Sequence, residues 1–214
     1  MIDLYTRPEA EGQKVQIMLE ECGLAYAIHL LNPSPDHDLP HRYLAICPDQ
    51  RSPAIVDHDS TDGRPLPVAH SIAILIYLAG KTGRFLPKSD RDRFKMLEWL
   101  AWSATLATRP QSELLDNGVA AGDPLLSVLD AQLGRTRAFV AGRQYTAADI
   151  AIGADCLGIC SEPAGFSAYP NLQRWLEAIQ ARPAVKRAMT TMHDGERRAR
   201  ATDHLESRIR DGTV

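Results

Sequence analysis

The stretch from Gln50 to Gly80 constrains the fold of this chain more than any other part of its sequence. Its Ser52-Pro53 pair precedes a short apolar, β-branched run that ends at polar and glycine turn residues. This is the pattern of a strand that is entered from a tight turn. A proline immediately before a strand fits a cis bond in such a turn, and we predict that Pro53 is cis.

The second half of the same stretch predicts a return strand and a buried helix. Leu66 to Val68 form the return strand, and Ser71 is a residue type favoured at a helix N-cap. The run from Ile72 to Ala79 is apolar on nearly all sides, so we expect the helix to be buried and to stop at Gly80. A turn beside a capped helix N-terminus leaves free backbone N–H groups and a hydroxyl. Such groups suit an extended peptide that ends in a carboxylate.

The residues ahead of this stretch predict two strands separated by a helix. Ile2 to Tyr5 form the first strand, a loop runs from Thr6 to Gly12, and Gln13 to Cys22 have the apolar spacing of a helix. Tyr26 to Leu31 form the second strand, and a short helix is expected over His41 to Ala45. This order of elements is that of a thioredoxin-like α/β domain, in which helices cover a mixed sheet.

The pattern changes after a polar connector marked by glycine and proline, and no further strand is predicted. Four helices are expected: over residues 90–108, after Asp123-Pro124, from Ala147 to Cys160 behind the capping pair Thr146 and Asp149, and from Pro170 onward. We therefore divide the chain into an α/β domain (1–80), a linker (81–89), an all-helical domain (90–193) and a charged tail (194–214). The tail is expected to be a solvated helix or a frayed end.

Composition and charge exclude several classes of partner. The net charge of −3 gives no reason to expect a nucleic acid or an acidic membrane surface. No apolar run approaches the length of a membrane span, about 20 residues, and the N-terminus lacks a signal-peptide profile. We therefore expect a cytoplasmic protein.

The cysteines and histidines show no spacing that is typical of a disulfide framework or a metal site. Cys156 and Cys160 are placed one helical turn apart, but no Cys-x-x-Cys motif occurs, and we expect all four cysteines to be reduced. The histidines considered as ligands are scattered along the chain, so no metal is predicted; they are His29, His37, His41 and His58.

Several motifs together resemble the cytosolic glutathione transferases, and most of all the bacterial Nu-type enzymes and their yeast prion-protein relatives. The motifs are the run Ser52 to Asp57, the helix at Ser71, the connector Lys81-Thr82-Gly83-Arg84-Phe85-Leu86-Pro87, and the second-domain capping box Thr146 to Ala151. The resemblance covers residues 1 to about 190 in the right order. It implies a thioredoxin-like domain followed by an all-α domain, glutathione as a co-substrate, and a homodimer.

The resemblance also implies which residues bind glutathione. Ser71 corresponds to the residue that holds the γ-glutamyl end, and Ser52-Pro53 to the pair whose backbone meets the cysteine. Arg51 fits a basic position near the glycine carboxylate. His70 stands where Glu or Gln is usual; its imidazole can still accept a hydrogen bond from an ammonium group, but it lacks the carboxylate charge.

At the position that activates the glutathione thiol in the Nu-type enzymes, this sequence differs from the family pattern. The Nu-type sequence Thr-Pro-Asn-Gly-x-Lys is replaced by residues 9–14, Glu-Ala-Glu-Gly-Gln-Lys, which puts Glu11 at the position of the Asn donor. An ionised carboxylate cannot donate a hydrogen bond, and its charge raises the pKa of a neighbouring thiol. Thr6 or the loop backbone could donate instead, Arg7 could supply positive charge, or Glu11 could act as a general base in a different reaction.

Family position further implies a pocket for the second, small and partly apolar substrate against the long helix of residues 90–108. The residues implied are Trp102, Thr105, Thr108 and Arg109. Trp99 and Trp102 lie on this helix, which faces the partner subunit in the family.

Two functions remain open from the sequence. The first is a glutathione-dependent transferase or disulfide reductase. The second is a binding or scaffold protein that keeps the fold but has weakened thiol activation. The substitution at Glu11 favours this function or an enzyme with a changed reaction. The enzyme ranks first, because the Ser71 helix and the proline turn persist and thiol activation can be relocated within a loop.

Overall fold

The computed structural model describes residues 1–31, 41–107, 122–161 and 163–191, without the side chains of residues 41 and 42. Four strands form one mixed sheet in the order β2-β1-β3-β4. They are β1 (Ile2–Thr6), β2 (Tyr26–Leu30), β3 (Ala54–Asp57) and β4 (Leu66–Ala69). β1 is parallel to β2 and antiparallel to β3, and β4 is antiparallel to β3.

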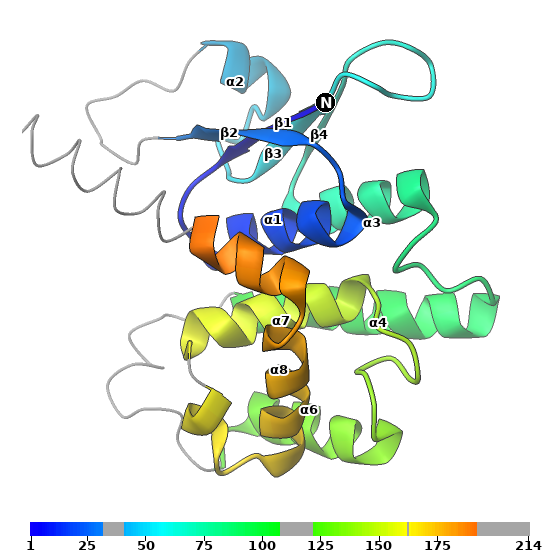
Figure 1. The fold of residues 1–214 in the computed structure, drawn as a ribbon, viewed down its shortest axis with the longest axis vertical. Coiled ribbons are helices and arrows are strands. Elements are labelled where there is room, and N and C mark those ends of the chain that lie inside the picture. The colour runs from blue at the N-terminus through cyan, green and yellow to red at the C-terminus, as the bar shows by residue number, and fades with distance from the viewer. Residues whose placement is uncertain (32–40, 108–121, 162, 192–214) are drawn as a thin grey trace, which may run out of the picture.

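Helices cover both faces of this sheet (Figure 1). α1 (Ala10–Cys22) and α3 (Ser71–Thr82) lie on one face, and the short α2 (His41–Ile46) lies on the other. The alternation of side chains along the strands explains the two cores. Ile2, Leu4 and Ile55 belong to the large core with α1 and α3, whereas Tyr5 and Ala54 belong to a smaller cluster with Tyr43 of α2.

The second half of the described chain is helical and lies below α1 and α3 in Figure 1. Its elements are α4 (Asp90–Ala107), α6 (Pro124–Thr136), α7 (Ala147–Ile159), the 3-10 turn η1 (Pro163–Phe166) and α8 (Pro170–Gln180), and residues 183–191 are also helical. α7 is buried along nearly its whole length and packs against α1 and α4. This agrees with its sequence, which is apolar on nearly all sides.

A buried aspartate fixes the start of α7. Thr146 and Asp149 form the predicted capping box. Asp149 also accepts hydrogen bonds from the Val140 N–H at 2.8 Å and from Nε1 of Trp175 at 3.0 Å, so it ties α7 to α8. Burial raises the pKa of the Asp149 carboxyl to about 6, against the opposing effect of these hydrogen bonds.

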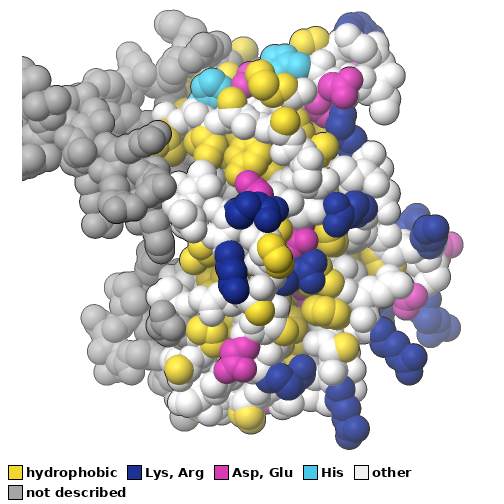
Figure 2. Space-filling model, in the orientation of Figure 1, with side chains coloured by type: hydrophobic (Ala, Val, Ile, Leu, Met, Phe, Trp, Pro, Cys, Tyr) yellow, Lys and Arg dark blue, Asp and Glu magenta, His cyan; other side chains and the backbone are white. Residues whose placement is uncertain are grey.

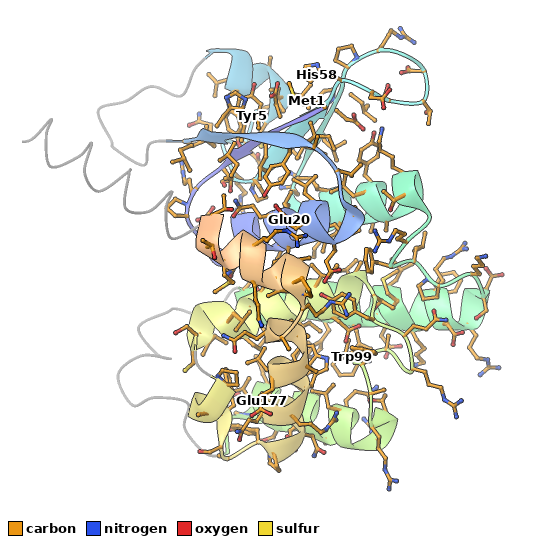
Figure 3. The ribbon with its side chains drawn as sticks, in the orientation of Figure 1. Met1, Tyr5, Glu20, His58, Trp99 and Glu177 are labelled. Atoms are coloured by element: carbon orange, nitrogen blue, oxygen red, sulfur yellow. The ribbon has the colours of Figure 1, made fainter. Side chains whose placement is uncertain are left out.

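Ion pairs join α1 to the helical half. The Arg182 guanidinium donates to both carboxylate oxygens of Glu21, and its carbon lies 3.8 Å from the centre of the Tyr145 ring. Nε of Arg187 donates to Glu20 at 2.6 Å. Figure 3 places Glu20 on the side of α1 that meets residues 183–191, and Figure 2 shows acidic and basic side chains next to each other there.

The structure confirms the predicted fold class and corrects the bounds of two helices. α1 begins at Ala10, so Glu11 lies in its first turn and not in a loop. A carboxylate in the first turn interacts favourably with the helix dipole. The charge of Glu11 therefore stabilises the earlier start of α1. α3 has His70 as its N-cap and ends at Thr82, with Gly83 as its C-cap at a φ of 64°, so Ser71 is not the cap and Gly80 is not the stop.

The remaining expectations hold to within a residue or lie outside the described residues. The second strand ends at Leu30, α4 at Ala107 and α7 at Ile159. The proposed domain limits remain predictions, and the tail of residues 194–214 falls outside the described part of the chain.

Candidate functional site

The turn before β3 has the predicted cis bond between Ser52 and Pro53. Oγ of Ser52 accepts a hydrogen bond from the backbone N–H of Arg7 at 2.9 Å, and the Pro53 carbonyl accepts one from the N–H of His70 at 3.1 Å. The Tyr43 hydroxyl donates to the carbonyl of Arg51. The turn is therefore held by the end of β1, by α2 and by the residue that begins α3.

The first turns of α1 and α3 meet beside this turn. The Ser71 hydroxyl donates a hydrogen bond to Oε2 of Glu11, and Ser71 is buried. Because a serine hydroxyl has one hydrogen, this bond commits it to Glu11 and leaves the oxygen as an acceptor. The residue that the sequence assigned to the γ-glutamyl end thus touches the residue that it assigned to the thiol.

A buried lysine balances the charge of Glu11. Nζ of Lys14 contacts Oε1 of Glu11 and lies 2.8 Å from Oδ1 of Asp155 on α7. The side chain of Lys14 is 1% exposed, that of Asp155 4%, and that of Glu11 33%. Only Glu11 of the three therefore reaches the open side of the site.

Asp155 titrates near neutrality in this environment. Burial raises the pKa of its carboxyl from 3.8 to about 7, Lys14 lowers it, and the charge of Glu11 raises it. Its Oδ2 atom is buried and has no hydrogen-bond partner among the described residues. The ammonium group of Lys14 is thus paired with two carboxylates, those of Glu11 and Asp155.

The other residues that were predicted to activate a thiol are partly engaged. Oγ1 of Thr6 donates to the Arg7 carbonyl at 3.0 Å, which uses its hydrogen. A Cβ on Gly12 would lie 2.0 Å from the same Oγ1, so only glycine lets α1 begin this close to β1. Nε of Arg7 is buried and has no hydrogen-bond partner within the described part of the chain.

An aspartate that the sequence did not single out lies between the two predicted basic residues. Oδ2 of Asp49 is 3.6 Å from Nε2 of His70 and 3.8 Å from Nε of Arg51. The Cys47 thiol donates to Asp49 at 2.9 Å, and this bond is the main cause of the lowered pKa of the Asp49 carboxyl. His70 adopts a φ of 69° and is exposed, so its ring reaches Asp49 from the start of α3.

Sequence reasoning missed Lys14, Asp155 and Asp49. Lys14 follows Glu11 by three residues, the spacing of an ion pair on one helix face, and its position inside an apolar stripe was the available signal. Asp155 lies in the apolar sequence of α7, where a lone acid needs a partner. Nothing in the sequence around Asp49 separates it from a surface loop residue.

The predicted substrate-pocket residues are only partly described. Trp102 is half-buried, with its ring edge-on to that of Trp99 at a centroid distance of 5.1 Å. Trp99 is 9% exposed and lies among the helices (Figure 3). Thr105 is exposed, and its hydroxyl donates to the Trp102 carbonyl at 2.7 Å. Thr108 and Arg109 lie outside the described residues.

The thiols of the protein itself are buried or partly buried. The four cysteines are free, and Cys47 and Cys156 are fully buried. Burial raises the thiol pKa of Cys22, Cys47 and Cys156. In the described ranges no cluster of His, Cys, Asp or Glu could hold a metal ion, and no helix is long and apolar enough to span a membrane.

Comparison with known proteins places this geometry in a family. Residues 12–81 match the N-terminal domain of the glutathione S-transferases, and residues 74–183 match their C-terminal domain. The disulfide-bond oxidoreductase YfcG of Escherichia coli K12 is 32% identical over 216 residues, which cover 93% of this chain and 99% of that protein. The oxidoreductase YghU of the same organism is 33% identical over 213 residues, covering 87% and 73%.

Solved structures agree with these matches. A glutathione transferase family member from Pseudomonas fluorescens, crystallised with two glutathione molecules, has a TM-score of 0.75 and 31% identity over 87% of this chain and 91% of that one. A glutathione transferase from Pseudomonas putida, with one glutathione disulfide per subunit, has a TM-score of 0.74 and 30% identity over 87% and 90%. This chain belongs to the glutathione S-transferase family.

Proposed function

We propose that this protein uses glutathione to reduce small disulfides or to conjugate small, partly apolar electrophiles. The observation that carries the proposal is the meeting of three elements at one place: the Ser52-Pro53 turn and the first turns of α1 and α3. Helix N-termini and a turn with free backbone groups suit a peptide with carboxylates. The likeness to YfcG and YghU, both disulfide-bond oxidoreductases, favours disulfide reduction.

The reactive sulfur in this proposal is that of glutathione. Three of the four protein thiols have raised pKa values because they are buried, and a thiol must ionise before it attacks. The bound glutathione thiolate attacks one sulfur of the substrate disulfide and releases the other as a thiolate, which takes a proton. A second glutathione thiolate then attacks the mixed disulfide, which yields glutathione disulfide and the second substrate thiol.

Each site residue has a proposed part in this reaction. Ser52, the residue before the cis-proline Pro53, offers its backbone to the cysteine of the tripeptide. Ser71 holds the γ-glutamyl end, and Arg51 attracts the glycine carboxylate. Asp49 lies 3.6 Å from His70 and supplies the carboxylate that His70 lacks for binding the ammonium group.

Thiol activation is assigned to the start of α1 and the residues before it. We assign the positive charge to Arg7. Its Nε atom is buried and has no hydrogen-bond partner among the described residues. The backbone of this segment donates hydrogen bonds in place of Thr6, whose hydrogen is engaged. The second substrate lies against α4 near Trp102 and Thr105, with Thr108 and Arg109 assigned to the same pocket by family position.

We also propose a cytoplasmic homodimer that contacts its partner through α4. Phe94 on this helix is 68% exposed, and burying such an apolar side chain against a partner would stabilise a dimer. Light scattering at tens of micromolar tests the dimer, and a monomer at that concentration contradicts it.

Calorimetric titration with glutathione and with its disulfide tests the proposed function directly. Binding of either ligand, together with turnover of a small disulfide in an assay coupled to glutathione disulfide reduction, supports it. A folded protein that binds neither ligand contradicts it.

The scaffold function is favoured by one observation, the carboxylate of Glu11 where a hydrogen-bond donor is expected. Glu11→Asn separates the two functions. An enzyme handicapped by Glu11 should show a lower pKa of the bound glutathione thiol and faster turnover in this variant, because a negative charge is replaced by a donor. An enzyme that needs Glu11 as a base loses turnover but keeps binding, and a scaffold shows neither effect.

A further inference from the structure

The strongest feature that the proposed mechanism leaves unused is the buried ion cluster of Glu11, Lys14 and Asp155. Lys14 is fully enclosed and its Nζ bridges the carboxylate of Glu11 on its own helix and that of Asp155 on α7, at 2.8 Å from the latter. Enclosing a lysine is costly unless its charge is matched by close anions. The cluster thus joins the helical half of the chain to Glu11, which accepts a hydrogen bond from the Ser71 hydroxyl.

Close packing keeps this bridge in place. A Cβ on Gly158 of α7 would lie 3.1 Å from the Cβ of Ala10, so α7 meets the first turn of α1 at near contact. The side chain of Lys14, one turn further along α1, is 1% exposed, and its Nζ lies 2.8 Å from Oδ1 of Asp155. A change of charge on Asp155 therefore acts on Lys14, and through it on Glu11.

We propose that Asp155 and Lys14 are positioning residues of the glutathione site, which set the orientation of Glu11 and the net charge beside it, and so the hydrogen-bonding state of Ser71. The proposal rests on the proposed function, because it assigns these residues to the binding of glutathione. Neither residue touches the ligand: Lys14 and Asp155 are 1% and 4% exposed at their side chains. Glu11, with a third of its side chain exposed, transmits the effect.

The charge of the cluster changes near neutral pH. With Asp155 protonated, one ammonium faces one carboxylate; with Asp155 ionised, it faces two, and the cluster gains a negative charge beside the site. The charged groups that act on Asp155 are Lys14 and Glu11, both on α1. The buried residues that α3, α4 and α8 contribute are uncharged. An added negative charge raises the pKa of a nearby thiol.

Opposite shifts in two variants test the proposal. The measurement is the pKa of the bound glutathione thiol, read from thiolate absorbance over a pH series. Asp155→Asn removes the second carboxylate charge and should lower this pKa, raising the thiolate fraction above pH 7 by about threefold, or half a pKa unit. Lys14→Met removes the cation and should raise the pKa by a similar amount, whereas Lys14→Arg should restore it.

A merely structural role predicts a different pattern. Loss of packing would weaken glutathione binding in both variants and at every pH, whereas the proposal predicts that Asp155→Asn matches the native protein below about pH 6, where both have a neutral group at residue 155. If Lys14→Met alone does not fold, the double variant Lys14→Met, Asp155→Asn removes the buried pair together. It should then differ from Asp155→Asn in the direction predicted for Lys14→Met.

Glu21→Gln is the matched control, because it breaks another ion pair of α1 with the helical half but does not touch Ser71. It should leave the thiol pKa unchanged. Shifts of the same sign in Asp155→Asn and Lys14→Met, or no shift in either, overturn the proposal while the proposed function stands.

A native protein that does not bind glutathione overturns the proposed function and this assignment of the cluster to it. The coupling itself is then read from the carbon-13 resonance of the Glu11 carboxyl in the unliganded protein. In the native protein this resonance should move between about pH 6 and pH 8, because Asp155 ionises beside Lys14 in that range, and in Asp155→Asn it should stay constant there. A resonance that behaves alike in the two proteins contradicts the coupling.

Discussion

At the scale of single residues, the structure changes the meaning of Glu11. From the sequence, Glu11 is a negative charge in a loop, which opposes thiolate formation. In the structure it lies in the first turn of α1, is paired with Lys14, and accepts the hydrogen of Ser71. The residues proposed to bind glutathione were assigned from motifs. Their mutual contacts were not, because they depend on how two helices meet, and this is set by packing far along the chain.

Ser71→Ala tests the site at this contact. The variant loses the proposed hydrogen bond between Ser71 and the charged γ-glutamyl end of glutathione. We expect the binding free energy of glutathione to weaken by about 1–3 kcal/mol. Because His70 and not Ser71 is the N-cap of α3, little of any stability loss should come from capping. Calorimetry and thermal melting measure the two effects. The control is Ser103→Ala, since this buried hydroxyl donates to the Leu100 carbonyl of its own helix at 2.7 Å. Unchanged affinity in a folded Ser71→Ala variant removes Ser71 from the site.

Gly12→Ala tests the close approach of α1 to β1. The added Cβ would lie 2.0 Å from Oγ1 of Thr6 and 2.7 Å from the Arg7 carbonyl oxygen, so the helix start must shift. We expect a loss of about 1–3 kcal/mol in the free energy of unfolding, with weaker glutathione binding. Gly80→Ala in α3 is the control, since no atom lies within 4 Å of its added Cβ. It should be neutral or should stabilise the protein by up to about 1 kcal/mol. Equal stability of the two variants contradicts the argument.

At the scale of elements, the sequence predicted every strand and every α-helix in the described ranges up to residue 180, but not the 3-10 turn η1, and it predicted less well where the elements start and stop. Hydrophobic periodicity and turn residues placed the strands to within a residue, because buried positions repeat with a fixed period. The starts of α1 and α3 were misplaced because tertiary contacts decided them. The backbone N–H of Arg7 donates a hydrogen bond to Oγ of Ser52, and that of His70 donates to the Pro53 carbonyl. The Ser71 hydroxyl donates to Glu11. The capping box of α7 was found because both of its residues lie within four positions of each other.

Thr146→Ala tests this capping box. Thr146 is buried, and its Oγ1 donates to Oδ2 of Asp149 at 3.0 Å, so its loss leaves Asp149 with one donor fewer. We expect the free energy of unfolding to fall by about 1–2 kcal/mol, measured by urea denaturation. In the control Thr136→Ala, the lost hydroxyl bonds carbonyls of its own helix α6, and the change should stay within about 0.5 kcal/mol. A similar loss in both variants contradicts a special role of the cap.

At the scale of the whole molecule, α1 links the proposed glutathione site to the helical half. It lies between the sheet and α7 (Figure 1), and it carries Lys14, Glu20 and Glu21, which pair with Asp155, Arg187 and Arg182. These pairs join residues more than 140 positions apart in the sequence. No local pattern predicts such partners, because a charged residue in one helix does not identify its partner in another. The family resemblance gave the arrangement of the two halves, but not the ions that join them.

The last prediction concerns the pH dependence of stability, which follows from two carboxyls of α7. Burial raises the pKa of Asp149 to about 6 and that of Asp155 to about 7, from 3.8. Between about pH 4 and pH 7 the folded protein therefore holds protons that the unfolded chain has released. The free energy of unfolding should fall as the pH rises through this window and level off above it. Below about pH 4 the sign reverses, since hydrogen bonds lower the pKa of Asp3, from His29 above all, and of Asp62, from Ser60 above all.

Urea denaturation of the full chain at closely spaced pH values between 3 and 9 measures this profile. Asp155→Asn should flatten the decline between pH 5 and pH 7, because a neutral amide is not ionised at any of these values. Glu21→Gln should keep the decline, since its carboxylate pairs with Arg182 and not with Lys14. If the decline is equally steep in Asp155→Asn and in the native protein, Asp155 is not the group that titrates. In that case the cluster keeps one charge state across neutral pH.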